Sequence, residues 1–189
     1  MKVTIIGTGT MGQAIAGIVR KGDNSLQALG HGDTETVTGE VVILAVPYPA
    51  VREVIDQRGK QLAGKVVVDI TNPVDFATFD SLVVPADGSS AAETAAALPD
   101  SRVLKAFNTN FAATLTSGTT GELPTTVLIA GDDAEAKALL ADVVTAGGLR
   151  AVDAGSLHRA REVEALGFLQ MTLAAGEKIG WTGGFALLP

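Results

Sequence analysis

The feature that most constrains this chain is a glycine-rich turn between a short apolar run and an amphipathic segment. The run Val3–Ile6 predicts a β-strand, and it is followed at once by Gly7-Thr8-Gly9-Thr10-Met11-Gly12. Apolar residues then recur at helical spacing up to Arg20-Lys21-Gly22, where cations and a glycine indicate a helix end. A GxGxxG sequence alone is weak evidence, but between a strand and a helix it is typical of a dinucleotide-binding fold. The first glycine permits the turn, the second admits a pyrophosphate, and the third permits close helix–strand packing.

Further apolar runs predict a mostly parallel sheet with helices between its strands. We expect strands at Ser25–Leu29, Val41–Val46, Val66–Ile70, Val103–Phe107, Thr125–Ala130 and Leu149–Val152, and helices near Ala50–Gln57, Ser90–Leu98, Asp133–Ala146 and Ser156–Ile179. The runs between residues 41 and 107 are nearly continuous rather than alternating, as in parallel strands that are covered on both faces. The sequence therefore predicts an α/β protein, a Rossmann-type, doubly wound, mostly parallel sheet with a short C-terminal strand–helix extension.

The Pro- and Gly-containing stretch Ser117–Pro124 is the best candidate for an internal boundary. It would divide the chain into a dinucleotide-binding core, residues 1–120, and a smaller C-terminal α/β part, residues 121–189, packed on that core. A loop within one structural unit explains the same stretch at least as well, so both interpretations stay open.

Composition and charge exclude several classes of function. The 189 residues carry a formal net charge of −7, and no Lys/Arg cluster supplies the basic stripe that a nucleic acid requires. Cysteine is absent and His31 and His158 are the only histidines, so we expect neither a disulfide scaffold nor a metal site. No apolar run approaches the ~18 residues of a membrane span. We expect a cytoplasmic protein without a membrane partner.

The end of the second predicted strand bears on the choice between NAD and NADP. NAD sites usually place an acidic residue about 20 residues after the glycines, where it binds the ribose hydroxyls. Here the strand ends in Leu29-Gly30-His31, which is not acidic, and this favours NADP. His31 could bind a 2′-phosphate or simply lie in solvent. Asp33 keeps NAD open, because a shift of one or two residues at the strand end would bring it into place.

Three neighbouring strands end in prolines and small amides, at the edge of the sheet where open α/β folds bind ligands. These ends contain Ala45-Val46-Pro47-Tyr48, Asn72-Pro73 and Asn108-Thr109. They predict a flat, neutral shelf beside a nicotinamide, with Asn72, Asn108 and Tyr48 as candidates that orient the ligands, although turn chemistry explains any one of them alone.

The shelf has few groups that could protonate a substrate. Tyr48 and Lys105 are the only plausible acids nearby, and Lys105 is expected to be a charge that reaches solvent from a sheet edge. Hydride transfer between two rings needs proximity more than it needs an acid, so it fits this inventory.

Five motifs in a fixed order resemble those of the NADP-dependent reductases of the deazaflavin coenzyme F420. They are GTGTMG at 7–12, AVPYPAV at 45–51, VDITNP at 68–73, KAFNT at 105–109 and GDDAEAK at 131–137. The resemblance spans essentially the whole chain and is closer still to short bacterial relatives described as predicted dinucleotide-binding oxidoreductases. It implies an NADP-dependent oxidoreductase that uses a flavin or deazaflavin as co-substrate, and typically a homodimer.

The resemblance also implies roles for particular residues. It places Thr8, Gly9, Thr10 and Met11 on the cofactor phosphates, Ala45, Val46 and Pro47 along the two riboses, and Asn72, Pro73 and Asn108 around the nicotinamide. The chain departs from the family at His31-Gly32, where characterised members carry a Ser-Arg pair for the 2′-phosphate. The helix that normally follows is reduced to the short segment 33–40.

Two other functions fit parts of the sequence. A non-catalytic dinucleotide-binding redox sensor is consistent with the small number of candidate general acids and bases near the predicted shelf. A carbonyl or imine reductase fits the GxGxMG form of the turn, although the long all-helical second domain usual in such enzymes has no room here.

The C-terminal third holds two further groups of interest. Trp181 and Phe185 are expected to pack in the core, with the acceptor pocket or a dimer contact as the alternative. A charged helix face is expected for Arg159, Arg161, Glu162 and Glu164, with a functional cluster as the alternative.

Overall fold

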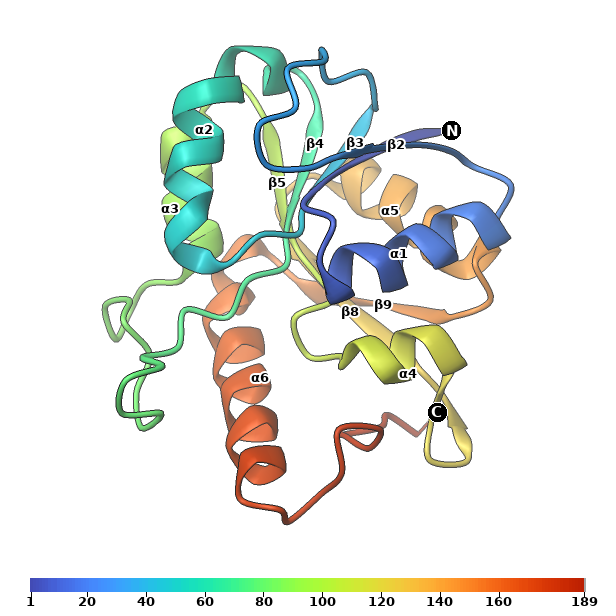
Figure 1. The fold of residues 1–189 in the computed structure, drawn as a ribbon, viewed down its shortest axis with the longest axis vertical. Helices are drawn as coiled ribbons and strands as arrows, with labels where there is room; N and C mark the ends of the chain where they lie inside the picture. Colours follow the sequence, from blue (N-terminus) through green and yellow to red (C-terminus); the bar gives the residue numbers. More distant parts are fainter. Residues whose placement is uncertain (189) are drawn as a thin grey trace.

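The computed structural model describes residues 1–188, and the chain forms a seven-stranded sheet. Helices cover both faces of the sheet (Figure 1). The strands of the sheet are β1 (Lys2–Ile6), β2 (Ser25–Leu29), β3 (Val41–Leu44), β4 (Val66–Asp69), β5 (Arg102–Lys105), β8 (Thr126–Gly131) and β9 (Arg150–Gly155). The helices are α1 (Thr10–Lys21), α2 (Tyr48–Leu62), α3 (Ser90–Ala97), α4 (Ala112–Ser117), α5 (Ala134–Ala146) and α6 (Ala160–Ala175). The chain also forms a small hairpin of β6 (Thr119–Thr120) and β7 (Leu123–Pro124) and a 3-10 turn at Leu157–Arg159.

The strand order is β2-β1-β3-β4-β5-β8-β9. The first five strands are parallel, β8 runs antiparallel to β5, and β9 is parallel to β8. The order reverses at β1, which lies between β2 and β3, and open α/β sheets bind ligands at the carboxyl ends of the strands at such a switch point. The predicted Rossmann-type, mostly parallel sheet with a C-terminal strand and helix is confirmed.

Alternate residues of the central strands enter two separate cores. Val41 and Ile43 of β3 belong to the core that includes side chains of α1 and α5, whereas Val42 and Leu44 belong to the core that includes side chains of α2. All four side chains are fully buried. Figure 1 shows α2 and α3 on one side of the strands and α1 and α5 on the other. Because both faces are covered, the strands read as continuous apolar runs in the sequence.

The second half of the chain departs most from the expected elements. Residues 112–124, for which no element is expected, form α4 and the β6–β7 hairpin. The helix expected over Ser156–Ile179 begins as a 3-10 turn and continues as α6 only to Ala175. Gly176 ends it, and Glu177 then takes a positive φ of 56°, which breaks the helical path. Ser89 caps α3 by accepting from the backbone N–H of Ala92, and Asp133 caps α5 by accepting from that of Ala136.

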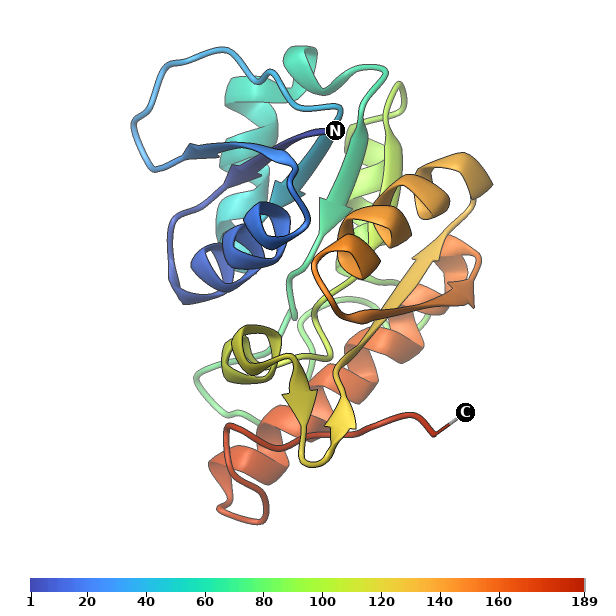
Figure 2. The ribbon, with the colours of Figure 1, turned by 90° about the vertical axis from the view of Figure 1, so that its right-hand side faces the viewer.

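The segment after α6 folds back along the helix, as Figure 2 shows. The backbone N–H of Phe185 donates to Gln170 Oε1 at 2.9 Å, which fixes this return. Trp181 comes to lie against Phe111 with ring centroids 4.9 Å apart. Trp181 is 53% exposed and Phe185 is 46% exposed, so the expectation that they pack in the core is wrong. None of the helices within residues 1–188 combines the length and the apolar character needed to cross a bilayer.

Candidate functional site

The glycine turn after β1 is shaped by the close passage of its backbone over the end of β3. Gly7 has φ +112°, and a Cβ there would lie 2.1 Å from the carbonyl oxygen of Ala45. A Cβ on Gly12 would lie 2.1 Å from the carbonyl oxygen of Gly7. Gly9 differs, because a Cβ there would meet nothing within 4 Å. Packing therefore requires glycine at positions 7 and 12, whereas Gly9 faces open space that a ligand can enter.

The N-terminus of α1 opens into the same space. Within the described chain no side chain caps its first turn, and that turn contains no acidic residue. Free backbone N–H groups at the positive end of a helix dipole bind anions. Together with the open side of Gly9, they fit the pyrophosphate of a dinucleotide without any basic side chain.

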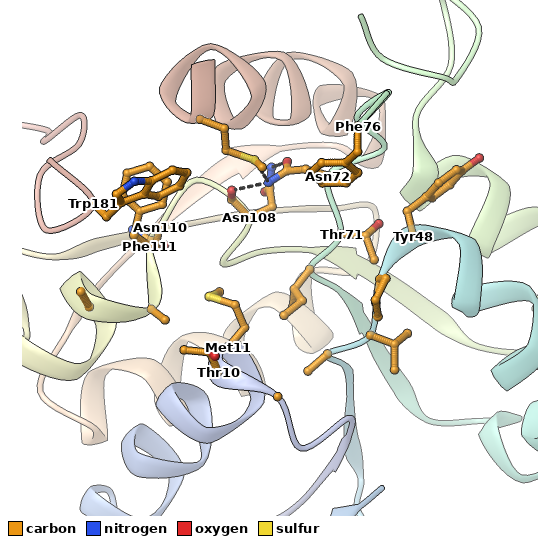
Figure 3. Close-up of a pocket in the computed structure, with 18 residues that line it drawn as sticks. Thr10, Met11, Tyr48, Thr71, Asn72, Phe76, Asn108, Asn110, Phe111 and Trp181 are labelled. Carbon is orange, nitrogen blue, oxygen red and sulfur yellow. Dashed lines mark hydrogen bonds between the residues drawn. The ribbon is translucent and has the colours of Figure 1, made fainter. Parts of the chain in front are cut away.

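A cavity of about 640 Å³ lies beside this turn, past the carboxyl ends of the parallel strands (Figure 3). It is lined by Gly9, Thr10, Met11, Ala45, Val46, Pro47, Tyr48, Ile70, Thr71, Asn72, Phe76, Asn108, Asn110, Phe111, Ala112, Ala113, Met171 and Trp181. Phe76, Phe111 and Trp181 give it aromatic rings, and Met11 and Met171 give it thioethers. An apolar cavity of this size with a few convergent polar groups suits flat organic rings.

Two amides in this cavity are bonded to one another. Asn108 Nδ2 donates to Asn72 Oδ1 and to the carbonyl oxygen of Val163, both at 2.9 Å. Asn72 Nδ2 donates in turn to the carbonyl oxygen of Asn108 at 2.9 Å. Helix α6 packs directly on the pair, since a Cβ on Gly167 would lie 2.7 Å from Asn72 Oδ1. Asn108 Oδ1 is buried with no hydrogen-bond partner among residues 1–188, and a ligand commonly satisfies such an acceptor beside a cavity.

Tyr48 stands at the rim of the cavity, but its hydroxyl is committed elsewhere. It donates to Glu93 Oε2 at 2.7 Å. Desolvation, this hydrogen bond and the charge of Glu93 together raise the pKa of Tyr48 to about 12. A hydroxyl so bound, and so weakly acidic, is poorly suited to protonate a substrate. The ring of Tyr48 forms part of the apolar lining of the cavity.

A second cavity of about 300 Å³ lies between the glycine turn, the end of β2 and α2. It shares Gly9, Ala45, Val46 and Pro47 with the first cavity, so the two meet at the switch point of the sheet. A dinucleotide that spans both would place its two halves on either side of the glycine turn.

Two side chains that line the second cavity, those of Asp33 and Arg58, hold the short segment after β2 in place by hydrogen bonds to its backbone. Asp33 folds back on the strand end, where its Oδ2 accepts from the backbone N–H of Gly30 at 2.7 Å. Arg58 of α2 donates to the carbonyl oxygen of Glu35 at 2.7 Å and to that of Asp33. Arg58 is only 7% exposed and holds the segment against α2. No sequence signal marks it, because its partners lie more than 20 residues away.

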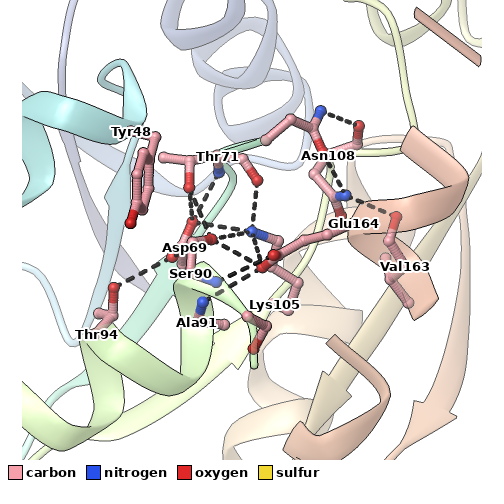
Figure 4. A network of polar contacts seen from close by, with 12 residues as sticks. Tyr48, Asp69, Thr71, Ser90, Ala91, Thr94, Lys105, Asn108, Val163 and Glu164 are labelled. Atoms are coloured by element: carbon pink, nitrogen blue, oxygen red, sulfur yellow. Dashed lines mark hydrogen bonds and ion pairs between the residues drawn. The ribbon is translucent and has the colours of Figure 1, made fainter. Parts of the chain in front are cut away.

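A buried ionic cluster lies behind the wall of the first cavity (Figure 4). Lys105 Nζ is 2.8 Å from Glu164 Oε1 and 3.1 Å from Asp69 Oδ1, and all three side chains are 0% exposed. Nζ also donates to the carbonyl oxygen of Thr71 at 2.5 Å. Ser90 Oγ, 2.9 Å from Nζ, is a fourth acceptor, so each of the three N–H groups of the ammonium has a partner inside the protein.

Each carboxylate of the cluster also receives backbone donors. Thr71 N–H donates to Asp69 Oδ1 at 2.7 Å, and Ser90 N–H, at the start of α3, donates to Glu164 Oε2 at 3.0 Å. Burial by itself would raise the pKa of Asp69, but the charge of Lys105 and the hydrogen bonds from Thr71 outweigh it and lower that pKa. The cluster is therefore built around an ionised Asp69.

This cluster corrects two expectations. Lys105 does not reach solvent from a sheet edge, because β5 is an inner strand between β4 and β8. The ammonium of Lys105 is paired with carboxylates inside the protein. Glu164 does not share an exposed face with its neighbours. Arg159 and Arg161 pair with Glu162 at 3.4 and 3.8 Å, whereas Glu164 points inward.

The structure brings most of the residues named from the sequence to these two cavities. The first is lined by Gly9, Thr10, Met11, Ala45, Val46, Pro47, Tyr48, Asn72 and Asn108, and the second by Gly7, Thr8 and His31. Gly12 and Pro73 line neither and are buried beside them. What each residue contacts in a bound ligand stays a prediction.

Several lining residues went unnoticed in the sequence, namely Phe76, Phe111 and Met171, because nothing but the folded chain brings them to the strand ends. Within residues 1–188, no group of three or more His, Asp or Glu side chains is placed to hold a metal ion.

Comparisons with known proteins agree with this arrangement. The family described as "NADP oxidoreductase coenzyme F420-dependent" matches residues 25–73. The F420-dependent NADP reductase of Methanocaldococcus jannaschii is 34% identical over 149 residues, which cover 77% of this chain and 66% of that protein. The F420-dependent NADP reductase of Methanothermobacter marburgensis is 34% identical over 146 residues, which cover 74% and 65%. The chain thus spans just under two thirds of the length of either relative.

A solved structure from Arthrobacter sp. FB24, provisionally described as an F420-dependent NADP reductase, resembles the chain over its whole length. It covers 100% of both chains with a TM-score of 0.85 and 22% identity. At that identity the likeness establishes the fold alone.

Alanine at two of the glycines should separate binding from folding. Gly9→Ala fits the fold but puts a methyl where the backbone is to meet the pyrophosphate, so we expect its dissociation constant for NADPH to rise about tenfold, a change of ~1.4 kcal/mol. Its melting temperature should stay close to that of the wild type. Gly12→Ala, whose methyl meets the Gly7 carbonyl oxygen, should instead lower the melting temperature. Fluorescence titration and thermal melts measure both effects, and normal binding by Gly9→Ala would contradict the assigned role.

Lys105→Met should test the buried cluster. It leaves two carboxylates buried without their cation, so we expect the free energy of unfolding to fall by about 3–5 kcal/mol in urea titrations. Lys137→Met is the matched control, because Lys137 pairs with Asp153, whose side chain is 60% exposed. That control should lose no more than about 1 kcal/mol. Equal losses of unfolding free energy in the two variants would show that the buried cluster stabilises the fold no more than an exposed ion pair does.

Proposed function

We infer that the chain belongs to the family of coenzyme F420-dependent NADP oxidoreductases, whose model matches residues 25–73, and we propose that it is itself an NADP-dependent oxidoreductase. In this proposal it binds NADP(H) across the switch point and transfers hydride between the nicotinamide and a flavin-like or deazaflavin-like acceptor, or another small molecule. The F420-dependent NADP reductases named above support the coenzyme and the acceptor class.

One observation carries the proposal. The open side of Gly9 and the uncapped start of α1 lie where the two cavities meet, and the larger cavity has aromatic and thioether walls. The pyrophosphate would lie on the helix start, with the nicotinamide end in the larger cavity. There Asn108 Oδ1, which has no hydrogen-bond partner among residues 1–188, and the Asn72–Asn108 pair offer hydrogen bonds to a carboxamide.

The residues of the larger cavity orient and shield the ligands. NADPH, when bound, supplies the hydride. The rings of Phe76, Phe111 and Trp181 offer stacking surfaces for a second ring and exclude water from part of the cavity. Hydride transfer from ring to ring needs this proximity and no protein acid.

The same geometry weakens the carbonyl or imine reductase alternative. The hydroxyl of Tyr48 is bonded to Glu93, and the ammonium of Lys105 is enclosed in the buried cluster. A redox sensor differs from the proposed enzyme only in lacking turnover, so an assay must separate the two.

The remaining parts of the proposal concern assembly, coenzyme choice and location. We propose a homodimer, which is supported by large apolar side chains left exposed on and after α6, at Leu169, Trp181, Phe185 and Leu188. The preference for NADP over NAD is proposed from the family, while NAD stays the alternative because Asp33, in the segment after β2, lines the second cavity. The cytoplasmic location and the division at residue 120 stay predictions.

Oxidation of NADPH and NADH, followed by absorbance with FMN, FAD and the deazaflavin as acceptors, tests the proposed function. We expect turnover with at least one of these acceptors and a preference for NADPH. Binding without turnover would favour the sensor, and absence of binding would refute the proposal.

Tyr48→Phe in the same assay separates the enzyme from a carbonyl reductase. Because the hydroxyl is held by Glu93, we expect turnover to persist at the same order of magnitude. Loss of a general acid typically lowers the rate by about 10²–10⁴-fold, and such a loss would restore the carbonyl reductase alternative.

A further inference from the structure

The buried cluster of Lys105, Asp69 and Glu164 is separated from the larger cavity by a single residue. Thr71 lines that cavity, and its hydroxyl donates to Asp69 Oδ1 at 2.8 Å. Its carbonyl oxygen accepts from Lys105 Nζ. Figure 4 shows Thr71 directly above the side chains of the cluster, with Tyr48 to its left and Asn108 to its right. The charges of the cluster therefore lie next to the part of the site where the nicotinamide is proposed to bind.

The cluster carries more negative than positive charge. Two carboxylates surround one ammonium, so the formal charge of the cluster is −1. All three side chains are 0% exposed, and solvent ions screen buried charges much less than exposed ones. The charge is consequently felt in the neighbouring cavity.

A purely structural cluster would not need the second carboxylate. One carboxylate and one ammonium form a neutral pair, whereas a buried net charge costs folding free energy unless it is fully hydrogen-bonded. Here Glu164 is held by Lys105, by Ser90 N–H at 3.0 Å and by the Ser90 hydroxyl at 2.8 Å. The fold thus stabilises a surplus negative charge at this place.

A nicotinamide ring is neutral when reduced and carries one positive charge when oxidised. We propose that the cluster of Lys105, Asp69 and Glu164 stabilises the oxidised coenzyme relative to the reduced one, and so favours departure of hydride from the bound coenzyme. The inference rests on the proposed function. Asp69 and Glu164 act at a distance, through charge, and touch neither substrate nor coenzyme. Two electrons pass with the hydride to the acceptor, and the ring that loses them gains the positive charge.

The test is the ratio of dissociation constants for NADP⁺ and NADPH, which requires no acceptor and no turnover. Trp181, the only tryptophan of the chain, lines the cavity and provides the fluorescence signal. Glu164→Gln keeps the shape of the side chain and removes the surplus charge. We expect weaker binding of NADP⁺, nearly unchanged binding of NADPH, and a ratio raised about tenfold, because the removed charge is buried and little screened. For a two-electron couple, tenfold corresponds to about 30 mV in the potential of the bound coenzyme.

Two controls separate charge from structure. Glu162→Gln removes an exposed charge two residues earlier in α6 and should leave the ratio unchanged. Ser90→Ala removes a hydroxyl of the same buried network without a change in charge, so it should lower stability and leave the ratio unchanged. If Glu164→Gln does not fold, Asp69→Asn removes the same charge from the β4 side.

The outcomes distinguish the inference from the proposed function. If both coenzymes bind and the ratio does not respond to Glu164→Gln or Asp69→Asn, the inference is wrong and the proposed function stands. If Ser90→Ala changes the ratio as much as Glu164→Gln does, the effect comes from a displacement of the network and not from its charge, and the inference is wrong. If the wild type binds neither coenzyme, the inference and the proposed function both fail.

Discussion

The close approach of the glycine turn to the end of β3 is the constraint on which the rest of the site depends. Any Cβ at Gly7 would overlap the carbonyl of Ala45, and any Cβ at Gly12 would overlap the carbonyl of Gly7. Because Gly7 and Gly12 have no Cβ atoms, α1 can start immediately above the switch point, where its free N–H groups face the strand ends. If this contact were looser, the helix start would move away from the place where the two cavities meet.

The opposite side of the larger cavity depends on α6, and α6 is positioned by polar contacts as well as by packing. Glu164 ties the helix to β5 and to the start of α3, while the carbonyl of Val163 binds Asn108 and Gly167 lets the helix approach Asn72. The chain after α6 then places Trp181 on Phe111. The C-terminal residues thus complete a cavity whose floor belongs to the sheet.

The sequence predicts the sheet well because its signals are local. A glycine motif, continuous apolar runs and the spacing between them are sufficient for β1–β5 and for the position of the first cavity. The signal fails where partners are distant in the chain. Lys105 looks like an exposed charge because its partners lie at residues 69 and 164, and Arg58 is unremarkable until the fold brings it to the segment after β2. Helix α4 has only six residues, and the hairpin strands have two each, too few for a periodic pattern.

The distribution of charge resolves an apparent conflict between an acidic protein and a polyanionic coenzyme. The formal charge of −7 belongs to side chains, whereas the phosphates would meet only the backbone N–H groups and the dipole of α1. At the other end, the ring that becomes positive on oxidation would face the surplus negative charge behind Thr71. The two cavities, positive at the start of α1 and negative at the buried cluster, would therefore complement an oxidised dinucleotide, which is negative at its pyrophosphate and positive at its nicotinamide. A charged side chain of either sign in the lining of the first cavity would disturb this match, and none of its lining residues within 1–188 is charged.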